Sequence, residues 1–524
     1  MLSSPSTRQL DSIIRNTVFS FIARGIDVAV TFALAVILAR YLGAKGMGQY
    51  TYVIAFVAIF VPLVDLGLDH ILIREIARSL APCGHSQDPS WPGRREQEGH
   101  APSCPTAPNQ YIGAALLLKI LIMLLALPLG MIAAWLIGHE RNEIWAIFLC
   151  FLGTLTFREI PTVVGYAVFL SYEKMEFRTL VTFLFQIVRF AVTLPVIFLG
   201  GGLVPIFGAA LVAEASQAML AMRLVTRRFA KPMLGGTRSV VSVCRYLLKE
   251  SLPIGIAFAF NSLYFQIDIL VLKYFRSAEE TGLFGVPFRV ITTLFTLLIP
   301  IIWVLLPHLT RAAKESIARL DQEGRGYLKA IAVVTGGITV YLALEARDLT
   351  VSLFGSEFER SAVVLAVISP VVISHAFLYF FDLTLTAVGK QKLVIIGSAV
   401  IFAVKLAADL IFVPTYGIMG AAVGTLAADL ACFLVMFYVT RKYVTSFNFG
   451  AIMLKPLAAL SSAAAVLYLL RHWPFYITFF VFGIAFAFFI WLYRVISPDQ
   501  RQFIKNMLQD KFQRFGGVRN TLGH

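Results

Sequence analysis

Charged side chains are scarce in this chain of 524 residues. Lys, Arg, Asp and Glu together account for 14% of it, whereas hydrophobic residues account for 58% and the mean hydropathy is +0.78. Soluble domains carry about 25% charged residues and about 45–50% apolar ones. A soluble chain this apolar would have surface that it could not cover. The composition therefore excludes an ordinary soluble domain and favours a protein that lies in a lipid bilayer.

Enzyme motifs and cysteines are scarce as well. The sequence contains no nucleophile elbow, phosphate-binding loop or metalloprotease motif, so we expect no ATP hydrolysis on this chain and no enzyme activity. Its five cysteines form no disulfide framework. Cys83-x-His85 and His100-x-x-x-Cys104 contain zinc-ligand types, but the first spacing is tighter than usual. We therefore expect no metal and no bound cofactor.

Long apolar runs, rather than alternating segments of about ten residues, predict membrane-spanning helices. A helix needs about 20 largely apolar residues to cross the hydrocarbon core. Runs of this kind occur at 14–40, 50–73, 111–137, 144–170, 177–200, 203–225, 246–274, 281–310, 328–346, 361–388, 392–413, 417–440, 451–471 and 475–496. The sequence thus predicts an all-α integral membrane protein with about fourteen transmembrane helices.

Lys and Arg gather in every second connection between these runs. Examples are Arg74 with Arg78, Lys174 with Arg178, and the basic stretch 223–238, whereas the connection at 200–205 carries no charge. Basic connections stay on the cytoplasmic side of a membrane. We therefore expect a multi-pass protein of the inner (cytoplasmic) membrane with both termini in the cytoplasm. The net charge of +15 then reflects this asymmetry and contact with anionic membrane lipids, and no nucleic-acid partner is expected.

The chain contains a weak internal repeat. Arg40-Tyr41-Leu42-Gly43 with Gly48-x-Tyr50 joins the first two predicted spans, and Lys273-Tyr274 with Gly282-x-Phe284 joins spans 7 and 8. Because six spans separate the copies, both have the same orientation, which predicts two parallel six-helix lobes. The expected domains are an N-lobe at 1–225 with a disordered cytoplasmic loop at 80–109, a cytoplasmic linker at 226–249, a C-lobe at 250–445, two extra C-terminal helices at 446–497, and a cytoplasmic tail at 498–524.

The first of the two segments, Arg40-Tyr41-Leu42-Gly43 with Gly48-x-Tyr50, resembles the first-loop signature of polysaccharide-repeat (Wzx-type, O-antigen-like) flippases. These flippases belong to the multidrug/oligosaccharidyl-lipid/polysaccharide exporter superfamily. Three further segments are similar to that family at the matching helix ends: Asp65-Leu66-Gly67-Leu68 before Arg74-Glu75, Ile267-Asp268, and Pro414-x-x-Gly417-Ile418-x-Gly420. The resemblance covers roughly residues 10–445. Members commonly have twelve spans, and the fourteen expected here match the peptidoglycan-precursor flippases instead.

The resemblance implies a fold and an activity. The fold is a V-shaped exporter. The activity is movement of a polyprenyl-pyrophosphate-linked oligosaccharide, the repeat unit of a polysaccharide, to the outer leaflet by alternating access. A lipid-linked oligosaccharide and membrane lipids are the expected partners, together with polysaccharide polymerase machinery.

Six ionisable residues of the first lobe fall near the middle of predicted spans: Arg24, Asp27, Arg158, Glu159, Arg189 and Glu214. An ionisable side chain at the bilayer centre costs at least ~2.5–3.5 kcal/mol unless it faces protein or water, which marks it as a functional candidate. Arginine suits a pyrophosphate because its guanidinium stays charged and forms a fork that matches phosphate oxygens. We expect Arg24 first, then Arg189 and Arg289, to bind the substrate. The full candidate set is Arg24, Asp27, Arg158, Arg189, Glu214 and, in the second lobe, Arg289.

Two alternatives qualify that set. The arginines could instead form internal ion pairs, Arg24 with Asp27 or Arg189 with Glu214. Arg158 and Glu159 are adjacent, so their side chains diverge by about 100° on a helix. At most one of the two faces a cavity directly.

The second lobe is more acidic. Lys405 and Asp409 are four residues apart and can neutralise each other. Asp268 and Asp429, with Asn261 nearby, would then be free to bind Na⁺ or to carry a proton, and we include Asp409 in this ion-coupling set. Alternatively, these carboxylates hydrogen-bond neighbouring helices. Gly420-x-x-x-Gly424 is expected to permit close helix packing.

The leading interpretation is a flippase for lipid-linked oligosaccharides. A second is a cation-coupled multidrug/toxin extruder of the same superfamily, which needs no phosphate-binding arginine. A third is a membrane glycosyltransferase or polymerase. That class would need catalytic residues in a large outer loop, and the outer connections of this chain are short.

Overall fold

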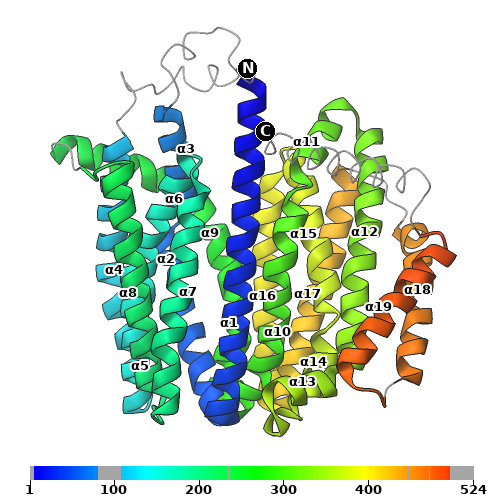
Figure 1. Cartoon of the computed structure of the whole chain (residues 1–524). Coiled ribbons are helices and arrows are strands. Elements are labelled where there is room, and N and C mark those ends of the chain that lie inside the picture. Colours follow the sequence, from blue (N-terminus) through cyan, green and yellow to red (C-terminus); the bar gives the residue numbers. More distant parts are fainter. Residues whose placement is uncertain (1–4, 81–107, 234–236, 445–448, 471, 496–524) are drawn as a thin grey trace, which may run out of the picture. The chain divides into compact units, whose positions relative to one another are not determined.

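The computed structural model describes residues 5–80, 108–233, 237–444, 449–470 and 472–495 (Figure 1). These residues form helices joined by short connections, and no strand occurs among them. The chain divides into two compact units, Met1–Gly285 and Val286–His524. The cysteine and histidine pairs between 83 and 104, most of the loop predicted at 80–109 and the tail predicted at 498–524 lie outside the described residues.

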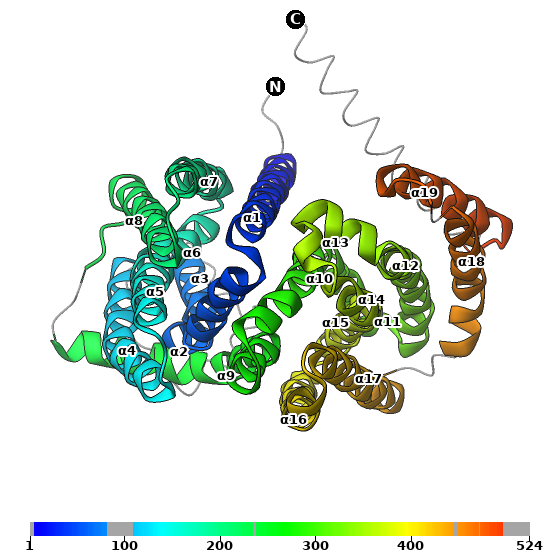
Figure 2. The ribbon, with the colours of Figure 1, turned by 90° about the horizontal axis from the view of Figure 1, so that it is seen from below.

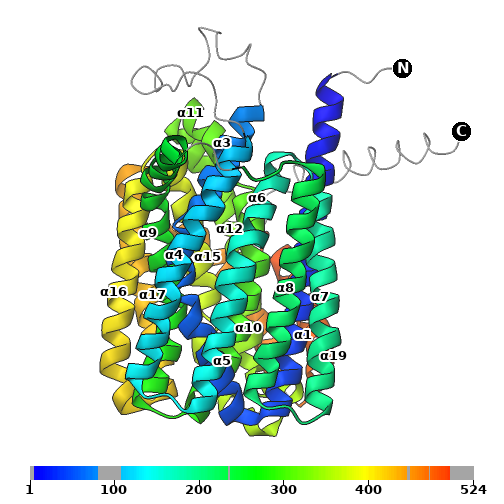
Figure 3. The ribbon, with the colours of Figure 1, turned by 90° about the vertical axis from the view of Figure 1, so that its left-hand side faces the viewer.

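The first unit is a bundle of long helices whose α4, α5, α7 and α8 lie side by side in Figure 3. Its elements are α1 (Pro5–Ala58), α2 (Val61–Asp65), α3 (Leu68–Leu80), α4 (Pro108–Ile137), α5 (Arg141–Phe151), the π-helical segment η2 (Leu152–Thr162), α6 (Val163–Ser171), α7 (Met175–Phe198), α8 (Leu203–Arg228), α9 (Thr237–Phe275) and the start of α10 (Ala278–Trp303).

The second unit contains the rest of α10 and nine further α-helices. These are α11 (Leu306–Glu315), α12 (Ile317–Leu344), α13 (Ala346–Phe354), α14 (Ser361–Ile368), α15 (Val371–Ala387), α16 (Gln391–Tyr416), α17 (Ile418–Tyr443), α18 (Phe449–Leu469) and α19 (Phe475–Leu492). A single 3₁₀ turn, η3 (Ser356–Phe358), precedes α14.

Thirteen stretches of the described chain are long and apolar enough to cross a membrane. The first of them, Ile22–Leu80, contains two predicted spans, because α1 kinks at Gly43, where φ is 66°. A positive φ is readily adopted only by glycine, which explains why the Arg40-Tyr41-Leu42-Gly43 motif lies at this point. Counting that stretch as two passes confirms the expected all-α membrane protein with about fourteen spans.

The predicted linker at 226–249 is largely helical. Its first residues end α8 at Arg228, and residues 237–249 form the first turns of α9. The first compact unit continues through α9 as far as Gly285, because α9 packs against α1, α2, α3 and α4. The lobe limits at 225 and 250 stay a prediction.

The second family-like motif, at Asp65-Leu66-Gly67, breaks the chain between α2 and α3. Leu66 and Gly67 have φ angles of 46° and 73°, and the Gly67 N–H donates to Asp65 Oδ2 at 3.1 Å. A Cβ added at Gly255 of α9 would lie 2.6 Å from the carbonyl group of Leu66. The break therefore lies directly against the backbone of α9.

The two copies of the internal repeat contact each other within the first unit. A Cβ added at Gly48 would lie 1.7 Å from the carbonyl oxygen of Ala278, and one added at Gly282 would lie 2.0 Å from that of Ala44. Gly48 and Gly282 are equivalent in the two copies, and each follows the alanine of its own copy by four residues. The contact is thus reciprocal. Its small residues allow the two helices to approach until their backbones touch.

The core of the first unit lies between α3, α4, α6, α7, α8 and α9. Its fully buried side chains include Leu68 and Leu72 of α3, Ile112 of α4, Val164 and Val168 of α6, Val181 of α7, Val225 of α8 and Leu247 of α9. In contrast, Leu124, Leu125 and Leu129 of α4 are exposed. An apolar face of this kind is compatible with contact to lipid, as expected for a helix at the rim of a membrane bundle.

In the second unit, α15 packs against α11, α12, α16 and α17. The pair α18 and α19 packs on α12 (Figure 2), where the Tyr341 hydroxyl donates to the Phe475 carbonyl oxygen at 2.7 Å. A Cβ added at Gly420 would lie 2.2 Å from the carbonyl oxygen of Phe412 on α16. The expected packing role of Gly420-x-x-x-Gly424 is therefore confirmed.

Candidate functional site

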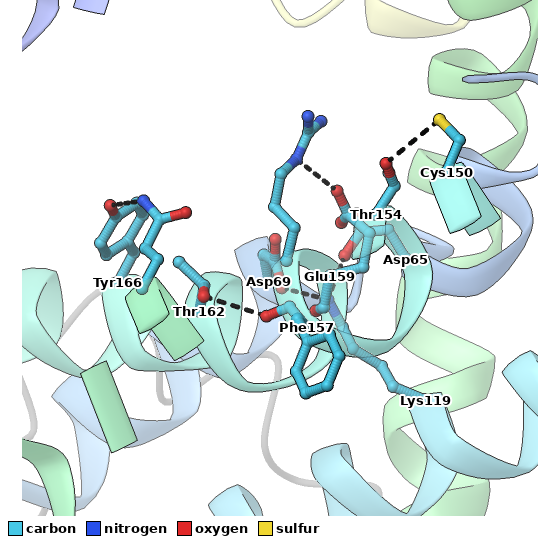
Figure 4. A network of polar contacts seen from close by, with 11 residues as sticks. Asp65, Asp69, Lys119, Cys150, Thr154, Phe157, Glu159, Thr162 and Tyr166 are labelled. Carbon is cyan, nitrogen blue, oxygen red and sulfur yellow. Dashed lines mark hydrogen bonds and ion pairs between the residues drawn. The ribbon is translucent and has the colours of Figure 1, made fainter. Parts of the chain in front are cut away.

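A buried ion-pair cluster lies in the first unit at the break between α2 and α3 (Figure 4). Lys119 of α4 is fully buried, and its ammonium donates to Asp65 Oδ1 at 2.8 Å, Asp69 Oδ1 at 2.8 Å and the Glu159 carbonyl oxygen at 3.1 Å. An ammonium has three donors, so each of its protons has an acceptor. Asp69 lies in the first turn of α3, where the helix dipole also favours a negative charge.

The π-helical segment η2 supplies the carbonyl group of that cluster. Pro161 has no N–H and so cannot donate to the Phe157 carbonyl oxygen, as an α-helical residue would. The Thr162 hydroxyl donates to that oxygen instead, at 3.0 Å, and the Val163 N–H reaches back five residues to Arg158. The local widening of the helix is typical of π-bulges, which occur frequently at functional sites.

Arg158 and Glu159 point in different directions from η2. The Glu159 side chain is 5% exposed and the Arg158 side chain 49% exposed, although Arg158 Nε still donates to Glu159 Oε1 at 3.3 Å. The Arg158 side chain is therefore about half exposed, whereas the Glu159 side chain is enclosed.

Glu214 of α8 lies against the same segment. A Cβ added at Gly153 would lie 2.2 Å from Glu214 Oε2, so a larger residue there would displace the carboxylate. Glu214 interacts electrostatically with Arg158 of η2 and Arg189 of α7. The Arg189 guanidinium also lies 5.9 Å from the ring centre of Phe185.

A second polar group joins α1, α6, α7 and α8. The Gln186 side-chain amide donates to Asp27 Oδ1 at 2.7 Å, which ties α7 to α1. The Tyr166 hydroxyl of α6 contacts Thr182 Oγ1 at 3.0 Å, and it accepts from the Gln217 amide of α8 at 2.9 Å. The Arg178 guanidinium lies 5.1 Å from the ring centre of Tyr166.

Four guanidinium groups of the first unit keep donors without a protein acceptor. In the described part of the chain, Arg24, Arg178 and Arg189 form no hydrogen bond and no ion pair, and Arg158 uses only Nε. The two ion pairs considered as alternatives, Arg24–Asp27 and Arg189–Glu214, do not form at contact distance between these described side chains. The arrangement leaves several permanent positive charges available to an anion.

The remaining candidates are distributed over both units. Asn261 is exposed and Asp268 is buried on α9, whereas Arg289 lies on α10 in the second unit. Asp409 of α16 is fully buried. The Lys405 ammonium of the same helix donates to Thr425 Oγ1 at 2.8 Å.

Asp429 is held by the neighbouring helix. Its Oδ2 accepts from Ser374 Oγ at 2.7 Å and lies 3.3 Å from His375 Nδ1, both on α15. The sequence left open whether Asp429 binds an ion or hydrogen-bonds a neighbouring helix, and in the structure its carboxylate hydrogen-bonds the neighbouring helix α15. No group of three or more His, Cys, Asp or Glu side chains that could hold a metal ion occurs among the described residues.

The sequence interpretation missed several members of the site. Lys119 is the only charged residue in the apolar run 111–137, and this is the signal that identified the other buried charges. Arg178 was assigned only to a basic connection. Gln186 and Gln217 carry no charge, so nothing in the sequence alone separates them from other polar side chains of membrane helices.

Comparison with known proteins adds a family model and a set of similar folds. The family model described as polysaccharide biosynthesis protein matches residues 13–313. No curated protein matches the chain.

Several solved structures have a similar fold. The lipid II flippase MurJ in an inward closed conformation is 15% identical, with a TM-score of 0.69 over 92% of this chain and 99% of that chain. An inward-facing multidrug resistance MATE family transporter of the MOP superfamily is also 15% identical, with a TM-score of 0.62 over 79% and 94%. A MOP superfamily transporter from Pyrococcus furiosus is 15% identical, with a TM-score of 0.58 over 83% and 95%. These similarities show the fold alone.

Proposed function

Because the chain belongs to the family of polysaccharide biosynthesis proteins, we propose that it carries the diphosphate-linked lipid precursor of a polysaccharide across the cytoplasmic membrane. The substrate class is a polyprenyl-pyrophosphate-linked oligosaccharide, and the mode of action is alternating access. The fold supports this proposal, because solved relatives with the same fold are transporters, including one flippase of a lipid-linked precursor.

The unpaired arginines of the first unit are the observation that carries the proposal. Arg24, Arg178 and Arg189 have no acceptor among the described residues, and Arg158 keeps its terminal nitrogens free. Cations inside a membrane protein are costly unless they face water or an anion. A diphosphate would supply the missing acceptors through charge-assisted, bidentate hydrogen bonds.

The spacing of the arginines suits a substrate that moves along the membrane normal. Arg178 and Arg189 are on the same helix, eleven residues apart, which corresponds to about 16 Å along α7. Arg24 interacts electrostatically with Arg178, whereas Glu214 links Arg189 to Arg158 electrostatically. The cations therefore form two groups at different depths, between which an anionic headgroup can pass.

A cation-coupled multidrug extruder is the competing function, because MATE transporters have a similar fold. Unpaired arginines in the first unit disfavour it, since they would repel a cationic drug. A membrane glycosyltransferase or polymerase is disfavoured because the family and the solved relatives point to transport rather than catalysis.

The test measures binding of undecaprenyl diphosphate to the purified full-length protein. Arg189→Ala removes one charge-assisted interaction of about 1.5–3 kcal/mol, which corresponds to a loss of affinity of about 10- to 100-fold. Arg227→Ala, at the exposed end of α8, removes an equal charge outside the site and serves as the matched control. We expect the control to bind as the wild type does, and undecaprenyl monophosphate to bind more weakly than the diphosphate. Equal affinities of wild type, Arg189→Ala and Arg227→Ala would contradict the proposal.

Complementation of a strain that lacks a known polysaccharide-repeat flippase tests the transport step itself. Wild type should restore polysaccharide export and Arg24→Ala should not, with both proteins present at equal levels in the membrane. We place the protein in the inner membrane with cytoplasmic termini, and we propose that polysaccharide polymerase machinery receives its product.

We further propose coupling to Na⁺ or H⁺ through carboxylates. Asp409 and Asp429 are fully buried in the second unit, and Asp268 is buried on α9, close to the predicted participant Asn261 in sequence. Buried carboxylates inside a membrane protein are typical of ion and proton pathways. Asp268→Asn with Asp429→Asn should slow export and change its ion dependence. Unchanged export with unchanged ion dependence would exclude this coupling route.

A further inference from the structure

The Lys119 cluster has no role in the proposed binding of the diphosphate. The ammonium is fully buried and all three of its donors are used, so it has no proton left to offer an anion. Its three acceptors come from three separate segments: the end of α2, the first turn of α3, and η2. The cluster therefore joins parts of the unit that are far apart in the sequence.

The surroundings of the ammonium are those of a bound cation. Two carboxylate oxygens and one carbonyl oxygen converge on it within 3.1 Å. When both are ionised, Asp65 and Asp69 together carry one charge more than Lys119 neutralises. Arg158 and Glu159 lie next to the cluster, but they pair with each other and do not change this balance. Oxygen donors of this kind are the ligands that hard cations prefer.

Stability alone gives a weak reason for such a cluster. A buried ion pair is often no more stable than well-packed apolar residues of the same volume, because desolvation offsets the attraction between the charges. Removing only the lysine would leave two carboxylates facing each other in a medium of low dielectric constant. They would be relieved either by sharing a proton or by taking up another cation.

We propose that the Lys119 ammonium is a tethered cation that permanently fills an oxygen-lined cation site in the first unit. With lysine in place, this unit takes up no inorganic cation at α2–α3. Without the ammonium, a monovalent alkali cation enters and is held by Asp65, Asp69 and the Glu159 carbonyl group. This inference goes beyond the proposed function and does not depend on the identity of the transported substrate.

The experiment uses the full-length protein in detergent and follows its thermal unfolding in NaCl, KCl and choline chloride at equal ionic strength. Lys119→Met replaces the lysine with an uncharged side chain of similar length. We expect the wild type to unfold at the same temperature in all three salts. We expect Lys119→Met to unfold several degrees lower in choline chloride and to recover most of that loss in NaCl or KCl.

Lys119→Met combined with Asp65→Asn is the matched control, because only one carboxylate then remains. It should unfold above Lys119→Met in choline chloride and should lose the response to alkali cations. A lysine that only packs would give no such selectivity between salts of equal ionic strength.

Two results would overturn the inference. One is that Lys119→Met unfolds at the same temperature in all three salts, or fails to fold in every one of them, because alkali cations then do not replace the ammonium. The other is that the wild type responds to NaCl or KCl as strongly as the variant does. Recovery of folded Lys119→Met only from membranes solubilised in NaCl or KCl would support it.

Discussion

The reciprocal contact between the two repeat copies makes a sharp prediction about Gly48 and Gly282. A methyl group at either position would lie 1.7 or 2.0 Å from a backbone carbonyl oxygen of the facing segment. Backbone cannot rotate away as a side chain does, so the two helices must separate by roughly 1.5 Å to restore an ordinary contact. Overpacking of this kind typically costs about 1–3 kcal/mol, and we expect the upper part of that range because both partners are backbone.

The assay is thermal unfolding of the purified protein. By the usual relation for domains of 150–250 residues, about 2–3 kcal/mol lowers the Tm by roughly 4–12 °C. Gly25→Ala, also in α1, is the matched control because nothing lies within 4 Å of its added Cβ. In a helix interior this change should stabilise the protein by about 0.5–1 kcal/mol.

The double variant tests whether the two positions report one contact. Once Gly48→Ala has separated the helices, a methyl group at residue 282 meets less resistance. The combined loss should therefore be clearly smaller than the sum of the single losses. Equal unfolding temperatures for Gly48→Ala and Gly25→Ala would refute the reasoning, and strict additivity would show that the glycines act independently.

Two further substitutions follow from the charges. Glu214→Gln removes the carboxylate that interacts with both Arg158 and Arg189, so undecaprenyl diphosphate should bind more tightly. An interaction of about 1.4 kcal/mol corresponds to about tenfold in affinity. Titration of the ligand against wild type and variant measures this change, and weaker binding by the variant would contradict the prediction. Burial raises the pKa of the Glu345 carboxyl, beyond the end of α12, against an opposing hydrogen bond from Thr478. As pH rises, the unfolded chain releases this proton before the folded chain does. The free energy of unfolding of the wild type should therefore fall as pH rises above about 4.3, the pKa of an unperturbed glutamate. Glu345→Gln should lessen this dependence on pH and should unfold at a higher temperature than the wild type at pH 7. Melting curves between pH 4 and pH 8 measure it, with Glu140→Gln, which is exposed, as the control; identical slopes for the three proteins would disprove the assignment.

Local patterns explain how much of the fold could be predicted. Apolar runs of membrane length mark each span, whatever its neighbours are, because lipid replaces the need for a protein partner. The motifs at Gly43 and Gly67 are also local: each places glycine where the chain takes a positive φ. The spans, their breaks and the candidate arginines other than Arg178 therefore followed from composition and order along the chain.

The hydrogen-bond partners of the buried charges could not be predicted from the sequence. Lys119 binds Asp65, Asp69 and Glu159, which are 40 to 54 residues away along the chain. Asp27 is held by Gln186, 159 residues distant, rather than by the nearby Arg24. Contacts over such separations depend on how helices rotate and pack against one another, and a period of 3.6 residues fixes neither. The sequence determined that the protein crosses the membrane, how often, and that charged side chains lie inside it. Only the tertiary structure decided which of those charges are satisfied and which arginines remain open to an anion.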